Sequence, residues 1–511
     1  MTSFTIPIID IFAGPGGLGE GFSTFPEHGK PVFAIKLSIE KDKFAHQTLE
    51  LRSFYRQFLG GTTPPEYYEY LRGKVSRRKL FENYPQEAVQ AGKEAWLAEL
   101  GKTSPETVKS RIAEALNGAR TWVLIGGPPC QAYSLVGRSR IRGQSKQKYA
   151  KDHRHFLYKQ YLKILADHQP PVFIMENVKG LLSSKRIKNE ENTFNLILSD
   201  LKHPNEVKLT NTDKPLSYRL FSLSKKQETG AELAPKDFVI RSEEYGIPQA
   251  RHRVIIFGIR EDICNSEPQI LERIPEKVFV DDVIGDLPKL RSGLSKNEDT
   301  AQTWLSAIRE IENAEWISEL SSEMKQSIKK AIKEIDSRLS RGRLFVQTSS
   351  KAKKYSVWYS DENLGGVCNH ESRSHITQDL HRYLFASVFA SVNHRSPTLS
   401  DFPRALLPKH KNVKEALKGS KFNDRFRVQV SGKPSTTVVS HISKDGHYYI
   451  HYDPSQCRSL TVREAARIQT FPDNYFFEGN RTEQYHQVGN AVPPMLAHKI
   501  AAIVFDVLEN L

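Results

Sequence analysis

A cysteine at the end of an apolar run is the side chain of this sequence best suited to covalent chemistry. The run Trp122–Ile125 enters two glycines and two prolines, and Cys130 follows directly. Such a run predicts a buried strand whose carboxyl end lies at the ligand-binding edge of an α/β sheet. Because each proline fixes its own φ and lacks an N–H, stiff backbone presents the thiol. Cys130 could act as a nucleophile, although a lone buried cysteine is more often structural.

A carboxylate takes the same position on a later apolar run. Glu176 follows Val172–Met175 and precedes Asn177 and Val178. Apolar neighbours disfavour the charged form of a carboxyl group, which suits Glu176 to give a proton near neutral pH. A helix-capping glutamate is the structural alternative.

Two arginines and a glutamine alternate before a third apolar run. Gln249, Arg251 and Arg253 precede Val254–Phe257, and strand alternation predicts that the three side chains share one face. Two arginines on one face need a carboxylate, a phosphate or a polar base edge as a partner. The structural alternative is an ordinary strand start exposed to solvent, where the arginines need no such partner.

These side chains need a scaffold, and the start of the chain predicts one. The apolar residues Ile8–Phe12 enter a glycine-rich turn and then a helical pattern. Glycine lets the backbone turn tightly and approach a ligand closely, as at the start of a nucleotide-type α/β unit. A second apolar run ends at Glu40, where a carboxylate could accept hydrogen bonds from a ribose diol, or could lie on the surface as an ordinary glutamate.

Taken together and in order, these segments resemble the cytosine carbon-5 DNA methyltransferase family. The shared motifs are Phe12-Ala13-Gly14-x-Gly16-Gly17, Pro128-Pro129-Cys130-Gln131, Glu176-Asn177-Val178, Gln249-x-Arg251-x-Arg253, the stretch Arg458–Asp473 and the stretch Gln487–Pro494. The resemblance covers about residues 6–48, 120–182, 237–260 and 431–505.

The resemblance implies a Rossmann-like S-adenosylmethionine-dependent methyltransferase domain of the α/β class, with a mostly parallel sheet and a smaller target-recognition domain. We expect the catalytic domain in residues 1–260, the target-recognition region in 261–430, and a C-terminal segment, 431–511, that completes the catalytic domain. Residues 51–117 form a charged, mostly helical insert that is longer than the family usually has. The family's acidic residue near the adenine is not recognisable in that insert.

The resemblance also implies roles for individual residues. Cys130 would attack carbon-6 of a cytosine, Glu176 would protonate or hydrogen-bond ring nitrogen 3, Arg253 would hold the carbonyl oxygen at position 2, and Arg251 would brace the site. The expected cofactor-binding residues are Phe12, Ala13, Gly14, Gly16, Gly17, Glu40, Pro129, Leu157, Asn490 and Val492. The expected DNA-binding residues are Ser134, Arg138, Arg140 and Gln249. No metal is required, because the sulfonium of S-adenosylmethionine is already activated.

Composition fits a polyanionic partner. Lys and Arg total 74 against 59 Asp and Glu, so the formal net charge is +15 and the sequence pI is about 9.4, as is typical of nucleic-acid-binding proteins. The four cysteines are far apart without a CxxC pair, which predicts neither a disulfide framework nor a zinc site. With no apolar run near 18 residues and no signal peptide, we expect a cytoplasmic bacterial protein without a membrane span.

Three functions remain open from the sequence. The leading one is methylation of double-stranded DNA by a protein that is monomeric on DNA and belongs to a restriction-modification or phage-defence system, with any cognate endonuclease or defence protein encoded separately. The second is methylation of RNA on the same scaffold. The third is a catalytically silent DNA-binding relative, against which the presence of both Cys130 and Glu176 argues.

Overall fold

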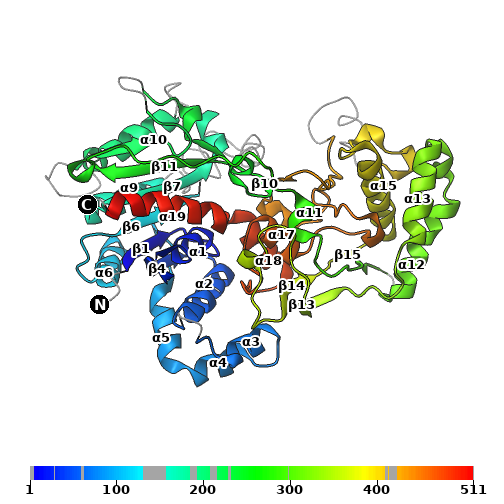
Figure 1. Ribbon diagram of the computed structural model, residues 1–511, viewed down its shortest axis with the longest axis horizontal. Coiled ribbons are helices and arrows are strands. Elements are labelled where there is room, and N and C mark those ends of the chain that lie inside the picture. The colour runs from blue at the N-terminus through cyan, green and yellow to red at the C-terminus, as the bar shows by residue number, and fades with distance from the viewer. Residues whose placement is uncertain are drawn as a thin grey trace.

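The computed structural model describes residues 5–27, 29–58, 62–129, 157–183, 193–207, 216–227, 232–296, 298–408, 413 and 423–509. Its main feature is an eight-stranded sheet with helices on both faces, in the left-hand part of Figure 1. In spatial order the strands are β5 (Ala95–Leu97), β4 (Phe33–Glu40), β1 (Ile6–Ile11), β6 (Val123–Gly126), β7 (Val172–Val178), β11 (His252–Arg260) and β8 (Tyr218–Phe221), with β9 (Val239–Arg241) also paired to β11.

The strand directions confirm the predicted α/β class. Strands β5, β4, β1, β6 and β7 are parallel, whereas β11 runs antiparallel to β7, β8 and β9. Parallel strands bury both faces under crossover helices, which explains why their sequences are nearly continuous apolar runs. The strands predicted to end at Glu40, Gly126 and Glu176 all lie in this parallel part.

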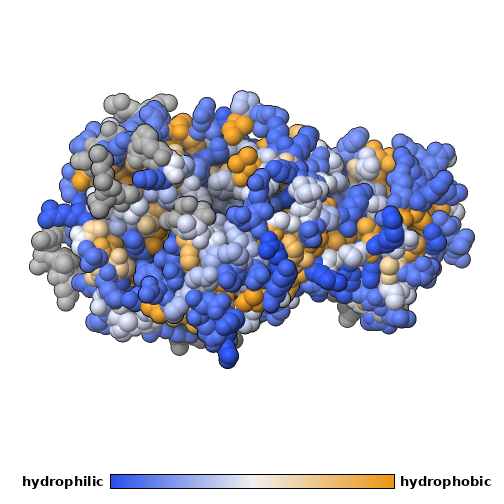
Figure 2. All heavy atoms as spheres, turned by 60° about the horizontal axis from the view of Figure 1, so that its bottom comes forward, coloured by the Kyte–Doolittle hydropathy of each residue, from blue (hydrophilic) through white to orange (hydrophobic). Residues whose placement is uncertain are grey.

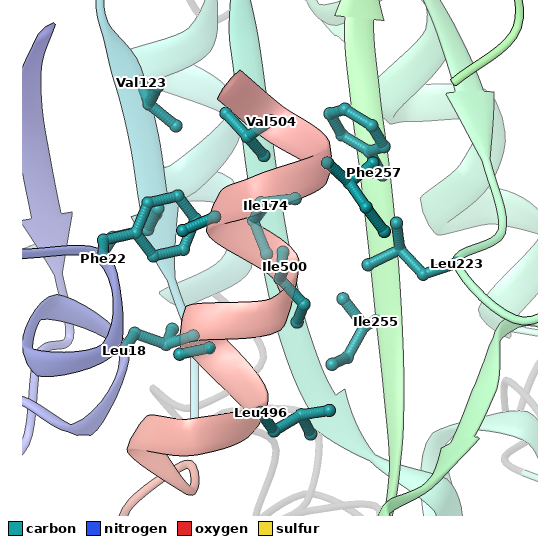
Figure 3. Close-up of a cluster of buried hydrophobic side chains, with 14 of the residues drawn as sticks. Leu18, Phe22, Val123, Ile174, Leu223, Ile255, Phe257, Leu496, Ile500 and Val504 are labelled. Carbon is teal, nitrogen blue, oxygen red and sulfur yellow. The ribbon is translucent and has the colours of Figure 1, made fainter. Parts of the chain in front are cut away.

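One face of the sheet is closed by the last helix of the chain, α19 (Pro494–Glu509), beside α1 (Gly17–Ser23). Figure 3 shows Leu496, Ile500 and Val504 of α19 directed at the same core as Phe22 of α1 and Ile174 of β7. The backbone approach is close, because a Cβ on Gly17 would meet the carbonyl oxygen of Val492 at 2.1 Å. The C-terminal segment therefore returns to the first glycine turn.

The same C-terminal segment is more apolar than we expected from the sequence. By length and composition alone, Arg481–Glu509 is long and apolar enough to cross a membrane, but 67% of its apolar window is buried inside the protein. Its apolar character is explained by packing on the sheet. The face of the molecule in Figure 2 is mostly hydrophilic, with hydrophobic residues in small groups between.

The opposite face of the sheet is covered by α6 (Pro105–Leu116), α9 (Leu157–His168) and α10 (Thr193–Lys202), whose apolar residues share a second core with the strands. Helix α9 begins at Leu157, one of the residues expected to bind the cofactor.

A separate hydrophobic core lies in the right-hand part of Figure 1, around α12 (Ala301–Arg309), α13 (Ser322–Lys333) and α15 (Thr377–Asn393). Phe426, Val428, Ile450 and Cys457 pack into this core as well. The division of the chain at about residue 430 stays a prediction, since residues on both sides of that point share the core.

Besides α6, the predicted insert contains β5 and the helices α3 (Pro65–Leu71), α4 (Arg77–Asn83) and α5 (Pro85–Glu94). Helix α2 (Lys43–Arg56) begins before the insert and ends inside it. The sequence did not predict β5, because three residues between helical stretches carry no readable period. Its pairing with β4, from Ser38↔Ala95 to Glu40↔Leu97, is a tertiary property.

The insert connects the β4–β5 edge of the sheet to the central hairpin formed by β13 (Gly342–Gln347) and β14 (Gly366–Glu371). The Tyr68 hydroxyl donates to Asp361 at 3.1 Å, and the Arg72 guanidinium donates to the backbone carbonyls of Asn363 and Leu364. Tyr70 donates to Glu478 at 2.6 Å. These contacts give the insert a structural role that the sequence left unexplained.

We expect Arg72→Ala to lower the melting temperature by roughly 2–8 °C, because two carbonyls would lose a charged donor, at about 1–3 kcal/mol. Differential scanning fluorimetry would measure this. Arg78→Ala is the matched control, since the Arg78 side chain is 87% exposed and pairs with Glu82 at 3.1 Å on the surface; surface pairs contribute about 0–1 kcal/mol. Equal shifts for both variants would contradict a bridging role.

Candidate active site

The sheet register places the ends of four parallel strands in one row. Ile11 of β1 pairs with Ile39 of β4 and with Gly126 of β6, and Gly126 pairs with Met175 of β7. The next residue of each strand therefore lies at the carboxyl edge, namely Glu40, Phe12, Gly127 and Glu176. With strands about 4.8 Å apart, this row spans about 14 Å from Glu40 to Glu176.

At one end of the row, Glu40 organises the glycine turn. Its Oε2 accepts the Gly14 N–H at 2.8 Å, and its Oε1 accepts the N–H groups of Lys41 and Asp42 at 2.8 and 2.7 Å. Burial raises the pKa of Glu40, and these backbone donors partly oppose the rise. Three of the roughly four lone-pair sites of the carboxylate are used in this way, so Oε2 keeps capacity for one further donor, such as a ribose hydroxyl.

The glycine turn fits a ligand that approaches the backbone. Gly14 adopts φ +58°, and a Cβ built on it would meet nothing within 4 Å, so open space adjoins the turn. Phe12 also has positive φ, and its side chain is half-buried beside Ala13. Gly16 differs: a Cβ there would lie 2.9 Å from the Tyr475 hydroxyl, so it allows close packing within the protein.

The described strand β5 adds a residue that sequence reasoning missed. Glu99 follows β5 at the carboxyl edge next to Glu40, and the Ala98 N–H donates to the Glu40 carbonyl at 2.9 Å. The Glu99 side chain is half-buried and pairs with Lys102 at 2.8 Å. The only available signal was an acidic residue after the weak apolar triplet Ala95–Leu97.

Beneath the glycine turn lies a buried acid, Asp10 of β1. It is 1% exposed, and neither carboxyl oxygen has a hydrogen-bond partner among the described residues. Burial, and then the nearby Glu40 carboxylate, raise the pKa of Asp10 to about 8. At neutral pH this carboxyl group is therefore held mainly in its neutral form.

This shift predicts a pH-dependent stability. Unfolded Asp10 ionises near pH 4 whereas folded Asp10 ionises near pH 8, so unfolding releases a proton between these values and stability falls as pH rises from about 4 to 8. Asp10→Asn should remove this fall. The melting temperature of the variant, relative to that of the wild type, should therefore increase from pH 5 to pH 8. Thermal scans across that range would show it; a pH-independent difference would contradict it.

At the other end of the row, Glu176 and Arg253 form an ion pair. The Arg253 Nε lies 3.0 Å from Glu176 Oε1, and both side chains are 13% exposed. A Cβ on Gly127 would meet Glu176 Oε2 at 2.9 Å, so the glycine lets the carboxylate lie against the backbone that leads to Cys130. The neighbouring Asn177 donates to the Pro128 carbonyl at 3.2 Å and fixes that backbone.

The three residues predicted to share one strand face, Gln249, Arg251 and Arg253, do not lie on one continuous strand. Gln249 belongs to the short strand β10 (Gln249–Ala250), which pairs with β16 (Ser435–Thr436) rather than continuing β11. Gln249 accepts the Val438 N–H at 2.7 Å, and Arg251 donates to the Val438 carbonyl at 2.7 Å. Of the three residues, Arg253 is the one that forms an ion pair with Glu176 among the described residues.

Gln249 is also unsuited to the predicted DNA contact in this structure. It is 0% exposed, and its Nε2 donates to Gln469 at 2.9 Å, so its amide is used within the protein. Arg251 is 1% exposed, and burial together with Arg253 lowers its pKa. Both residues attach the C-terminal segment to the start of β11 and so hold Arg253 in place.

The remaining predicted residues are distributed as follows. Pro129 and Leu157 are half-buried, Val492 is buried beside Gly17, and Asn490 is exposed at the end of α18 (Arg481–Asn490). Cys130, Ser134, Arg138 and Arg140 lie outside the described residues.

Four basic or aromatic residues of the 261–430 region are internal. Arg373, His375, Arg382 and Tyr383 are all buried, and Arg373 donates to the carbonyls of Ile442 and Lys444 at 2.7 Å. They connect elements around the separate core of α12, α13 and α15 rather than forming a surface. Over the described parts of the chain, no group of three or more His, Cys, Asp or Glu side chains could hold a metal ion.

A parallel sheet with a glycine turn after the first strand, a carboxylate after the second and an acid–arginine pair at the same edge defines the class of S-adenosylmethionine-dependent methyltransferases. The chain belongs to the C-5 cytosine-specific DNA methylase family, whose sequence model matches residues 105–212 and 236–505. It is a DNA (cytosine-5-)-methyltransferase by class, with S-adenosylmethionine as methyl donor.

Individual relatives agree with this assignment. The type II methyltransferase M.Bpa9945I of Bacillus paralicheniformis is 33% identical over 524 residues, which cover 98% of this chain and 99% of the relative. The DNA (cytosine-5-)-methyltransferase M.ApeKI of Aeropyrum pernix is 26% identical over 77% of this chain and 83% of its own. A solved DNA modification methyltransferase encoded within an E. coli prophage is similar in fold, with a TM-score of 0.51 at 16% identity over 99% of this chain and 100% of its own.

Proposed function

We propose that this enzyme methylates carbon-5 of a cytosine flipped out of double-stranded DNA at one specific sequence, through a covalent adduct with Cys130. The observation that carries the proposal is the Glu176–Arg253 ion pair, packed against the backbone of Gly127 in the same row as the glycine turn. This arrangement puts an acid and a cation next to the segment that ends in Cys130.

The residues would act in sequence on the base. The Cys130 thiolate forms a bond to carbon-6, and Glu176 protonates or hydrogen-bonds ring nitrogen 3, so that the ring gains electron density at carbon-5 without accumulating negative charge. Arg253 holds the oxygen at position 2. Bound S-adenosylmethionine supplies an activated methyl group for carbon-5. Loss of the carbon-5 proton and breaking of the Cys130–carbon-6 bond restore the aromatic ring.

The cofactor would occupy the other half of the row. Phe12, Ala13 and Gly14 would face it, and Glu40 would accept the ribose hydroxyls while holding the turn through its backbone contacts. Further contacts would come from Pro129, Leu157, Asn490 and Val492. Gly16 and Gly17 would act by permitting close packing of the turn. Glu99 would supply the acidic adenine contact.

A base inside a duplex cannot reach this edge, so it must leave the stack at a cost of a few kcal/mol. Ser134, Arg138 and Arg140, which follow Cys130 in sequence, would contact phosphates of the flipped strand, giving position without sequence information. Residues of the 261–430 region would read the sequence. We place the enzyme in the bacterial cytoplasm, as a monomer on DNA, with any cognate endonuclease encoded separately.

RNA methylation is not favoured, since the family and the named relatives are DNA methyltransferases. A silent relative is disfavoured by the intact Glu176–Arg253 pair. The test is transfer of labelled methyl to mixed-sequence duplex DNA and to tRNA, followed by base-resolution mapping of 5-methylcytosine. Label at cytosines of one DNA sequence is expected; label on tRNA alone, or on neither, would reject the proposal.

A further inference from the structure

A basic groove lies beside the active-site edge of the sheet. Val178, Arg253 and Ile240 form one row across β7, β11 and β9, so Lys179, His252 and Arg241 form the next row outward. A hollow of about 370 Å³ opens here. Its charged lining comprises Lys179, Lys225, Lys236, Arg241, Arg273, Asp237 and Glu244.

The charge of the groove is strongly one-sided. Five cationic side chains face two carboxylates, which leaves three positive charges in excess. The second hollow of the same domain, about 950 Å³ in volume, is the contrasting case. It lies along β8 and the far end of β11, and its charged lining is Lys202, Arg219, Glu232, Glu261 and Glu267. Positive charge is therefore concentrated at the edge that carries Glu176 and Arg253, not in every hollow.

The cations of the groove are only partly neutralised by the protein. Glu244 is shared by Arg241 and Arg273 at 3.4 Å each, and Lys225 lies 3.7 Å from Asp237. Lys179 and Lys236 are exposed and form no ion pair among the described residues. Exposed lysines without partners, next to arginines that share one carboxylate, suit a line of anions such as phosphodiesters.

We propose that this groove binds the phosphate backbone of the substrate DNA where it flanks the flipped cytosine. The inference rests on the proposed function, because it assumes a DNA strand at the Glu176 edge. The occupant is a phosphodiester strand. The groove lies beside the Glu176–Arg253 pair, where the strand must pass, and its positive charge complements the negative phosphates. Lys179 and Lys236 each neutralise one phosphate, and contacts to the backbone add affinity without sequence preference.

The test is the salt dependence of binding to a mixed-sequence duplex, measured by fluorescence anisotropy with S-adenosylhomocysteine present. For the double variant Lys179→Gln/Lys236→Gln, we expect the slope of log Kd against log salt to fall by about 1.8, at about 0.9 per phosphate contact. Duplex affinity should weaken roughly tenfold at 0.15 M salt. The Kd for S-adenosylhomocysteine without DNA should change less than about twofold, since neither lysine lies at the glycine turn.

The matched control is Lys74→Gln/Lys79→Gln. Both lysines are exposed and have no ion pair among the described residues, and they lie at or next to α4, at the bottom of Figure 1 and far from β11. A wild-type slope in the control, together with a reduced slope in the groove variant, supports phosphate binding in the groove. Equal slopes in wild type, control and groove variant would overturn the groove but not the function. Failure of the wild type to bind duplex with any salt dependence would overturn both.

Discussion

Cys130→Ser should reduce methyl transfer to DNA by at least about 10³-fold, because a serine hydroxyl at neutral pH cannot replace a thiolate as nucleophile toward carbon-6. Binding of S-adenosylhomocysteine should stay within about twofold of wild type, since the substitution exchanges one sulfur for oxygen and leaves the predicted cofactor contacts, Pro129 among them, unchanged. Single-turnover transfer of labelled methyl and isothermal calorimetry would measure the two quantities separately.

The control for this substitution is Cys264→Ser. Cys264 is half-buried and follows η6 (Glu261–Ile263) at the far end of β11 from Arg253, where its thiol contacts the Ser266 carbonyl. Normal activity is expected for it. A Cys130→Ser enzyme that still turns over at the wild-type rate would remove the covalent mechanism.

Glu176→Gln should lower kcat by about 10²–10⁴-fold, the range typical of a lost general acid. Glutamine is nearly isosteric, so packing against Gly127 is kept, but the proton donor and the countercharge of Arg253 are both lost. Because an unpaired buried cation costs several kcal/mol, the melting temperature should fall as well. Rapid-quench kinetics under saturating DNA would give kcat free of binding effects.

Two further variants distinguish an effect on the catalytic step from an effect on the stability of the protein. Glu243→Gln changes another polar contact at the start of β11, the hydrogen bond between Glu243 and His252 at 2.7 Å, and should lower stability with little loss of kcat. Glu176→Asp keeps the charge on a shorter side chain and should retain part of the activity. A Glu176→Gln enzyme with kcat within a few-fold of wild type would show that Glu176 is not the acid.

Much of the cofactor half of the site could be predicted from local sequence. Apolar runs that end at Glu40, at Gly126 and at Glu176 predicted strands β4, β6 and β7, because buried parallel strands need continuous apolar residues. The glycine turn after β1 was predictable because Gly14 and Gly16 adopt positive φ, which few other residues tolerate. Each of these properties depends on residues that are neighbours in the sequence, so it can be predicted locally.

What the sequence by itself determined was therefore the type of sheet, the residues at its carboxyl edge and the family of the chain. Only the tertiary structure decided that Gln249 and Arg251 hydrogen-bond to Val438, since that outcome depends on a segment nearly 190 residues away. It also decided that β5 joins the sheet and brings Glu99 next to Glu40. The physical reason is the same in both cases: a side chain's partner across the fold is fixed by packing between distant segments, which local period and propensity do not encode.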